Sequence, residues 1–226
     1  GNWFLQALMW SQGQALMENG EFMIDTPEGL KALETMKALF EGCNMPNLGT
    51  GDAQAFFNSG NSGMFFWSTS SVAAVERGKT DFDFRTNEYP GLLASGPKGL
   101  PAGGNAAMLV SQSDDPAVLD ASWKWLKFIT SGEGAADVAR TTGYMPPNQA
   151  ANELILKDFS AENPTPAPAV RPLPLLSDWQ AYPGDNGLAI TQVIYDAIEG
   201  IVTDEYNDMA ELQEMVKEEV SDLLPR

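Results

Sequence analysis

The sequence contains no histidine and only one cysteine, Cys43, and both features exclude chemistry that many enzymes use. Histidine is the usual general base near neutral pH, the commonest metal ligand and the activator of serine and cysteine nucleophiles. A single cysteine cannot form an internal disulfide, which fits a reducing compartment or a periplasmic protein that avoids thiols. We therefore predict no catalytic residue, no metal site and no cofactor.

Positive charge is also scarce, because 13 Lys and Arg stand against 31 Asp and Glu, for a formal net charge of −18. So acidic a surface repels nucleic-acid phosphates and anionic lipids, and neither is an expected partner. The sequence has no run of about 18 apolar residues and no signal-peptide pattern. Its 43% hydrophobic and 19% charged residues are typical of a globular protein.

Two further sequence patterns needed for catalysis are missing. Gly96-Pro-Lys-Gly99 is too short for a phosphate-binding loop and lacks the Lys-Ser/Thr pair that completes one. Ser70 is not in a G-x-S-x-G turn, and no histidine is present to activate it. The acidic residues of the last helix lie at helical spacing, which a solvated face explains. The sequence therefore favours a binding protein over an enzyme.

Apolar residues at helical spacing predict helices along most of the chain. The clearest starts at Thr26-Pro27, an N-cap with proline in the first turn. The predicted helices cover residues 2–18, 26–41, 52–58, 72–77, 116–129, 135–140, 150–159, 188–201 and 209–224. Apolar or alternating segments predict strands at 64–67, 81–86 and 106–112, and Trp123 falls at core spacing in its helix. Strands interleaved with an excess of helices indicate an α/β fold. The prolines in residues 162–187 predict an irregular loop region there.

Hydroxyl groups gather where the first predicted strand meets a helix. Ser68, Thr69, Ser70 and Ser71 follow Trp67 there, so hydroxyls and free backbone N–H groups would meet at a helix N-terminus and could hold ligand oxygens. Simple N-capping is the alternative explanation of these serines. Trp67 would line the same pocket or pack in the core.

Two other segments offer groups to a ligand. Gly103-Gly104-Asn105 presents bare backbone and an amide before a predicted strand, unless it is only a tight turn. Tyr144 presents a ring and a hydroxyl, which suit a sugar pocket, unless it only packs. The candidate ligand-binding residues are Trp67, Ser68, Ser70, Gly103, Gly104, Asn105 and Tyr144.

Several of these segments together resemble the family 1 extracellular solute-binding proteins of ABC importers. Phe57-Asn-Ser-Gly-Asn-Ser-Gly-Met64 is similar to the family's F-x-x-G-x-x-A-M element. Gly103-Gly104-Asn105, Ala121-Ser-Trp-Lys-Trp-Leu-Lys-Phe-Ile129 with Ser131-Gly-Glu133, and Thr142-Gly-Tyr-Met-Pro146 also resemble family segments, in the same order. The resemblance extends over nearly the whole chain and is nearest to the carbohydrate and glycerol-3-phosphate branch.

The resemblance implies a helix-rich lobe of a type II periplasmic-binding-protein fold, with residues 1–226 as one C-terminal lobe and the N-terminal lobe missing. It implies capture of a sugar or polyol between lobes, delivery to ABC permease subunits, and a periplasmic or membrane-anchored extracellular location. The segment Gly184–Gln192 has no arginine for a phosphate, and only Arg140 and Arg171 are near in sequence, which favours a neutral ligand. An uncovered half-cleft would favour self-association of the fragment. The alternative is an acidic α/β scaffold lobe that binds a protein partner and no small ligand.

Overall fold

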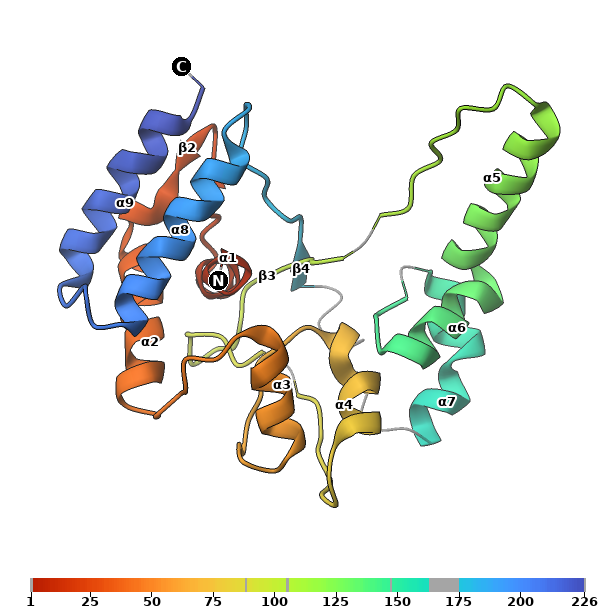
Figure 1. Ribbon diagram of the computed structural model, residues 1–226, viewed down its shortest axis with the longest axis horizontal. Coiled ribbons are helices and arrows are strands. Elements are labelled where there is room, and N and C mark those ends of the chain that lie inside the picture. The colour runs from red at the N-terminus through yellow and green to blue at the C-terminus, as the bar shows by residue number, and fades with distance from the viewer. Residues whose placement is uncertain (1, 88, 105, 147, 163–174, 226) are drawn as a thin grey trace. The chain divides into compact units, whose positions relative to one another are not determined.

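The computed structural model describes residues 2–87, 89–104, 106–146, 148–162 and 175–225 (Figure 1). The chain forms two compact units. Unit 1 comprises Gly1–Asn47, Tyr89–Gly103 and Pro174–Arg226, and unit 2 comprises Leu48–Glu88 and Gly104–Leu173. That residues 1–226 form a single lobe stays a prediction.

Unit 1 packs long helices around one apolar core (Figure 1). The helices are α1 (Asn2–Gln12), α2 (Pro27–Glu41), α8 (Gly187–Val202) and α9 (Met209–Leu223), with a 3₁₀ turn, η1, at Met23–Asp25. Each of the four contributes fully buried side chains, among them Leu5, Leu33, Ile190 and Leu212. The predicted helices at 26–41, 188–201 and 209–224 are confirmed to within a residue or two.

The start of α2 shows why this boundary could be predicted. The Thr26 hydroxyl accepts a hydrogen bond from the backbone N–H of Gly29 at 3.2 Å, and Pro27 occupies the first turn, where no N–H is needed. Asp208 caps α9 in the same way through the N–H groups of Ala210 and Glu211. Each cap satisfies backbone donors that the helix itself leaves unpaired.

The first predicted helix is wrong beyond Gln12. Residues Met17–Glu18 form strand β1, which pairs antiparallel with β2 (Glu21–Phe22) across Asn19 and Gly20. Asn19 and Gly20 have φ of 52° and 86°, as the two central residues of a type I′ turn require. The Asn-Gly pair, which looked like a helix stop, is therefore the turn of a hairpin.

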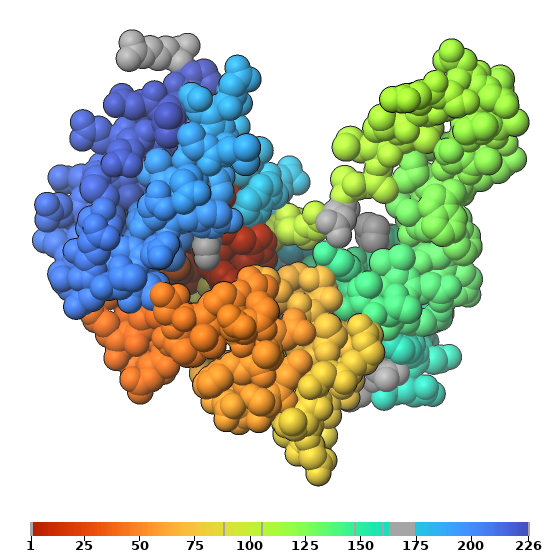
Figure 2. All heavy atoms as spheres, viewed as in Figure 1, coloured from red at the N-terminus to blue at the C-terminus, as the bar shows by residue number. Residues whose placement is uncertain are grey.

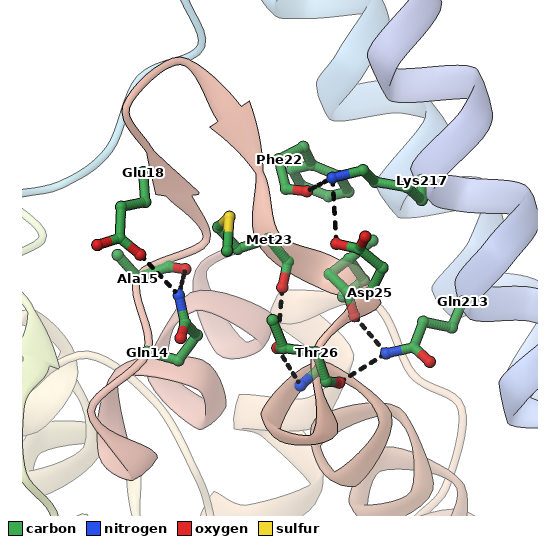
Figure 3. Close-up of polar contacts among 11 residues, drawn as sticks. Gln14, Ala15, Glu18, Phe22, Met23, Asp25, Thr26, Gln213 and Lys217 are labelled. Atoms are coloured by element: carbon green, nitrogen blue, oxygen red, sulfur yellow. Dashed lines mark hydrogen bonds and ion pairs between the residues drawn. The ribbon is translucent and has the colours of Figure 1, made fainter.

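Side chains of α9 tie this hairpin and the start of α2 to the core (Figure 3). Gln213 is buried, and its amide donates hydrogen bonds to the carbonyls of Ile24 and Thr26, the latter at 2.7 Å. The Lys217 ammonium donates to the carbonyl of Phe22 and pairs with Asp25 at 3.1 Å. Backbone carbonyls of the loop before α2 are thus satisfied from a helix nearly 190 residues away.

Gln213→Leu is therefore expected to lower the free energy of unfolding by about 2 kcal/mol, because it takes this donor from the buried Ile24 carbonyl and leaves the Thr26 carbonyl with the Leu30 N–H alone. Urea unfolding followed by circular dichroism measures the loss. Gln192→Leu is the matched control, since Gln192 bonds only the exposed Asp196 on its own helix. Equal effects of the two changes would contradict the role given to Gln213.

A short parallel ladder fixes the segment before Gly103 within unit 1. Strand β3 (Leu100–Pro101) pairs with β4 (Leu176–Ser177), and Ala102 N–H continues the contact by donating to the carbonyl of Ser177 at 2.7 Å. Residues 178–186 lie outside any helix or strand, as predicted for that part of the irregular region. The predicted proline-rich loop at 163–174 lies outside the described residues.

Unit 2 has many short elements and a small core. Its elements are α3 (Thr50–Asn58), the 3₁₀ turn η2 (Thr69–Ser71), α4 (Val72–Gly78), α5 (Pro116–Thr130), α6 (Gly132–Thr142), the π-helix η3 (Ala151–Ile155) and α7 (Lys157–Glu162). Its core cluster comprises Ala135, Ala136, Ala151 and Leu156, with partly buried side chains around them. The helix predicted at 150–159 is thus replaced by the π-helix and α7.

The predicted strands at 64–67 and 81–86 are wrong within the described part of the chain, where neither segment joins a ladder. Both segments are held by rings instead. Phe57 is buried, stacks on Phe65 with centroids 5.5 Å apart, and meets Phe82 and Phe84 edge to face. The apolar run at 64–67 and the alternation at 81–86 thus supply rings to this aromatic cluster and do not indicate backbone pairing.

Two other predictions for unit 2 are also wrong. Residues 106–112 are exposed and belong to no strand of the described chain. Trp123, expected in the core, keeps 54% of its surface exposed, because α5 presents a wider apolar face than α6 covers. The helix itself begins at Pro116 as predicted, with Asp115 accepting a hydrogen bond from Ala117 N–H.

Candidate ligand-binding site

The serine cluster of unit 2 forms a compact turn at the start of α4. Ser68 caps η2, and its hydroxyl accepts hydrogen bonds from the backbone N–H of Ser70 at 3.3 Å and from the Ser70 hydroxyl at 3.1 Å. The capping explanation of Ser68 is therefore correct. Ser68 is exposed and Ser70 half-buried, so capping leaves both hydroxyl oxygens near solvent.

The end of α6 brings Tyr144 to this turn. Gly143 ends the helix at φ 90°, and a Cβ there would lie 2.7 Å from the carbonyl oxygen of Thr69 and 2.8 Å from Cβ of Val72. Only glycine allows this close approach in this conformation. Tyr144 follows directly, half-buried, with its N–H donating to the Thr142 hydroxyl at 3.1 Å. The structure thus brings Ser68, Ser70 and Tyr144 together from segments more than 70 residues apart.

Trp67 ends the aromatic row of unit 2. Its indole stacks on Phe65 at 6.1 Å with an interplanar angle of 11°, and Phe65 stacks in turn on the buried Phe57. Trp67 nevertheless keeps 41% of its surface exposed. A ring fixed on one side and exposed on the other is suited to stack against an apolar ligand face. Trp67 directly precedes Ser68, so this residue lies at the start of the serine turn.

The structure gives a packing reason for one glycine of the pair. A Cβ on Gly103 would lie 2.8 Å from Nε1 of Trp3, so the indole of Trp3 uses this bare backbone. Gly104 is exposed with open space around it and belongs to unit 2, and Asn105 lies outside the described residues. A ligand role of these three residues stays a prediction.

A pocket of unit 1 contains candidate residues that the sequence did not single out as a group. Its volume is about 320 Å³, and it is lined by Asn2, Trp179, Gln180, Ala181, Tyr182, Asp185, Gly187, Leu188 and Thr191. The lining combines a partly exposed indole, a carboxylate, amides and a hydroxyl, and includes no Lys or Arg. A mainly apolar pocket with a few polar groups is the usual form of a small-molecule site.

Buried polar contacts hold the walls of this pocket. The Tyr182 hydroxyl donates to the Asn2 side-chain oxygen at 2.9 Å, and burial raises the pKa of Tyr182, so this phenol stays a neutral donor. The Gln180 side chain accepts from Met17 N–H at 2.9 Å and donates to the Met17 carbonyl at 2.7 Å. Trp179 therefore directly precedes an anchored residue, Gln180. The sequence separation of Asn2 and Tyr182, 180 residues, hides this grouping from the sequence.

A larger pocket of unit 1, about 600 Å³, lies where α2 meets the loop before α9. Its only cationic lining residue is Lys37, whose ammonium already contacts Glu41 at 3.1 Å, Asp204 at 3.6 Å and Asn207 Oδ1 at 3.0 Å. These contacts neutralise its charge within the protein. This pocket has no aromatic lining, so it suits a sugar less well than the smaller one.

The family of the chain follows from comparison with known proteins. The model of the bacterial extracellular solute-binding protein family matches residues 1–168, about three quarters of the sequence. The chain belongs to this family. Its members are described as binding proteins, and their extracellular description agrees with the location expected from the sequence.

Solved structures of three other proteins share the fold of this chain. UgpB of Mycobacterium tuberculosis, in complex with glycerophosphocholine, matches with a TM-score of 0.71 at 18% identity, over 98% of this chain and 55% of its own. The cyclic α-maltosyl-1,6-maltose binding protein of Arthrobacter globiformis matches with a TM-score of 0.75 at 20% identity, over the same shares. The maltose-bound T. maritima MalE3 matches with 0.67 at 18% identity, over 97% and 56%.

These matches confirm the predicted helix-rich solute-binding-protein fold, and the chain spans about 55% of the length of the structures it matches. No curated protein sequence matches it. Among the described residues, no cluster of three or more cysteine or carboxylate side chains forms a metal site. No helix in the described ranges is long and apolar enough to span a membrane.

Proposed function

We propose that the chain is part of the solute-binding component of a bacterial ABC importer and captures a neutral sugar or polyol. The observation that carries the proposal is the 320 Å³ pocket, whose lining includes Trp179, Asp185 and Asn2 and no cationic residue. Aromatic faces cover the apolar side of a sugar ring, while carboxylate and amide oxygens accept its hydroxyl protons.

The turn of unit 2 offers the same chemistry in a second place. There Trp67 provides a partly exposed ring and Ser68 and Ser70 provide hydroxyls, with Tyr144 anchored beside them by Gly143. We propose that each set of residues can contact a sugar within its own unit. The role is capture and delivery to the permease, since neither set joins a nucleophile to a base.

A neutral ligand is favoured over a phosphorylated one. Phosphate recognition calls for Arg or Lys, and neither lines the pocket nor occurs in Gly184–Gln192. Two of the matched structures carry maltose or a maltose derivative in their names, and the third carries glycerophosphocholine. Maltose and glycerol 3-phosphate are therefore suitable probes of the two ligand classes.

The test is a thermal-shift titration of the chain with each probe. Maltose is expected to raise the melting temperature saturably, because a ligand that binds only the folded state stabilises it, and glycerol 3-phosphate is expected to have no effect. Trp179→Ala should weaken the maltose effect at least about tenfold, equivalent to about 1.4 kcal/mol. Glu34→Ala in the larger pocket is the matched control and should leave the maltose-induced rise in melting temperature unchanged.

Two outcomes would contradict the proposal. A shift with glycerol 3-phosphate alone would replace the neutral ligand with a phosphorylated one. No shift with any member of a panel of mono- and disaccharides would favour the acidic scaffold lobe that binds a protein partner.

A further inference from the structure

A fully buried amide on α1 reaches the wall of the 320 Å³ pocket in unit 1. Most residues of α1 are buried, and only a small area of this helix, in red, is visible in Figure 2. Gln6 has 0% of its surface exposed. Its Nε2 donates to the Gln180 carbonyl at 3.1 Å, and its Oε1 accepts from the Gln180 N–H at 3.4 Å. One side chain thus pairs with both backbone groups of a residue 174 positions away.

These two hydrogen bonds restrain the backbone on both sides of Gln180. The N–H of Gln180 belongs to a planar peptide unit that also contains Cα of Trp179, and its carbonyl belongs to the next unit, which contains Cα of Ala181. Trp179, Gln180 and Ala181 all line the pocket, whereas Gln6 does not. Gln6 therefore restrains three consecutive lining residues from behind the wall.

The Gln180 side chain extends the same arrangement to the hairpin. Its amide accepts from the Met17 N–H at 2.9 Å and donates to the Met17 carbonyl at 2.7 Å, as a neighbouring strand would. Two glutamine amides in series thus join α1, the pocket wall and β1. Each amide uses one donor and one acceptor, so each fixes the direction as well as the position of its partner.

An apolar residue would serve the core at position 6 at least as well as glutamine. Gln6 follows the core residue Leu5, and full burial costs a glutamine both hydration and rotamer freedom. The backbone groups of Gln180 do not need a buried partner, because Trp179 and Ala181 beside them are exposed and water is within reach. What the amide adds is a single conformation of this loop.

We infer that Gln6 is a positioning residue of the pocket, which holds the Trp179–Gln180 peptide and so fixes where Trp179 leaves the wall. The effect of this restraint on affinity rests on the proposed function. A wall that is ordered before the ligand arrives loses less conformational freedom on binding, so preorganisation raises affinity. A purely structural glutamine would affect stability alone.

Two buried glutamines on the same helix provide a test and its matched control. Gln6→Met keeps the length and volume of the side chain and removes both hydrogen bonds to Gln180. Gln12→Met removes an equally buried amide, but Gln12 donates to the carbonyls of Leu8 at 3.2 Å and Glu28 at 2.9 Å, and neither residue lines the pocket. Gln6→Asn, with an amide one methylene shorter, is the milder variant if Gln6→Met does not fold.

The first readout is the NMR order parameter S² of the Gln180 backbone N–H in the chain without ligand. We expect about 0.85 in the unchanged chain and in Gln12→Met, and less than about 0.6 in Gln6→Met. The indole N–H of Trp179 should lose order together with this amide. An S² that stays unchanged in Gln6→Met, or that falls equally in Gln12→Met, would overturn the inference.

The second readout is the affinity for maltose, measured by calorimetry. Gln6→Met should weaken binding at least about fivefold and Gln12→Met by less than about twofold, even if both lower the melting temperature equally. Unchanged affinity in Gln6→Met despite a lowered S² would make Gln6 a structural residue and overturn the inference. If the unchanged chain bound no maltose or other sugar, the proposed function would fail instead, and S² would still decide whether Gln6 holds the wall.

Discussion

Gly29→Ala is expected to lower the free energy of unfolding by about 4 kcal/mol, near the upper end of single-residue effects. A Cβ at this position would lie 1.9 Å from the carbonyl oxygen of Ile24, far inside contact distance. Relief requires the Ile24 carbonyl to move, and this carbonyl accepts a hydrogen bond from the buried Gln213. One methyl group would thus disturb both the first turn of α2 and the attachment of α9.

Urea unfolding measures the effect, and Gly187→Ala is the matched control in the same unit. Gly187 lies in the first turn of α8, and a Cβ there would lie no closer than 3.8 Å to the Tyr182 carbonyl. This change should be near neutral, since alanine is the better helix former. If Gly29→Ala proved as harmless as Gly187→Ala, the packing of α2 against the preceding turn would be wrong.

Tyr144→Ala is expected to weaken carbohydrate binding at least about tenfold, a loss of about 1.4 kcal/mol. Tyr144 directly follows Gly143, which packs on the serine turn, so its removal takes away an aromatic face from this part of unit 2. Tyr144→Phe keeps the face and should lose less. Calorimetry with maltose measures both.

Tyr195→Ala is the control for this prediction, because Tyr195 is an exposed tyrosine on α8 of unit 1. It lies outside the lining of the 320 Å³ pocket and outside the serine turn. Unchanged affinity in Tyr144→Ala would remove this residue from the proposed site. Equal losses in Tyr144→Ala and Tyr195→Ala would indicate a general loss of folded protein.

The sequence predicts the helices well because their signals are local. The Thr26-Pro27 cap and the Asp115-Pro116 start each act within one turn, so no tertiary contact is needed to read them. Asn19-Gly20 shows the limit of this approach. The same pair ends a helix or turns a hairpin, and only the pairing of Met17 with Phe22 decides.

The strand predictions were wrong for a different reason. The apolar run at 64–67 and the alternation at 81–86 reflect contacts of their rings with Phe57, and a ladder needs a backbone partner as well. Trp123 shows the same limit on a helix, because helical spacing identifies an apolar face without showing that anything covers it. Whether an apolar helix face is buried depends on residues that are distant in sequence.

The candidate site was predicted in part. Ser68, Ser70 and Tyr144 were identified separately, and the packing of Gly143 on Thr69 brings them together. The pocket around Trp179 could not be read from the sequence, since Asn2 and Tyr182 meet across 180 residues. The ligand role of the glycine pair stays a prediction, and the close approach of Trp3 to Gly103 joins residues 100 positions apart, which local sequence does not show.

The central claim, that this solute-binding protein binds a neutral sugar, is tested most directly by an NMR titration of the tryptophan indole N–H signals with maltose. The indole of Trp179 is expected to shift saturably, with a smaller shift for Trp67, whereas Trp125, an exposed indole on α5, should not move. Glycerol 3-phosphate should leave all of them in place. The claim would be contradicted if saturating maltose shifted the indole signals of neither Trp179 nor Trp67. It would also be contradicted if maltose shifted every indole signal equally.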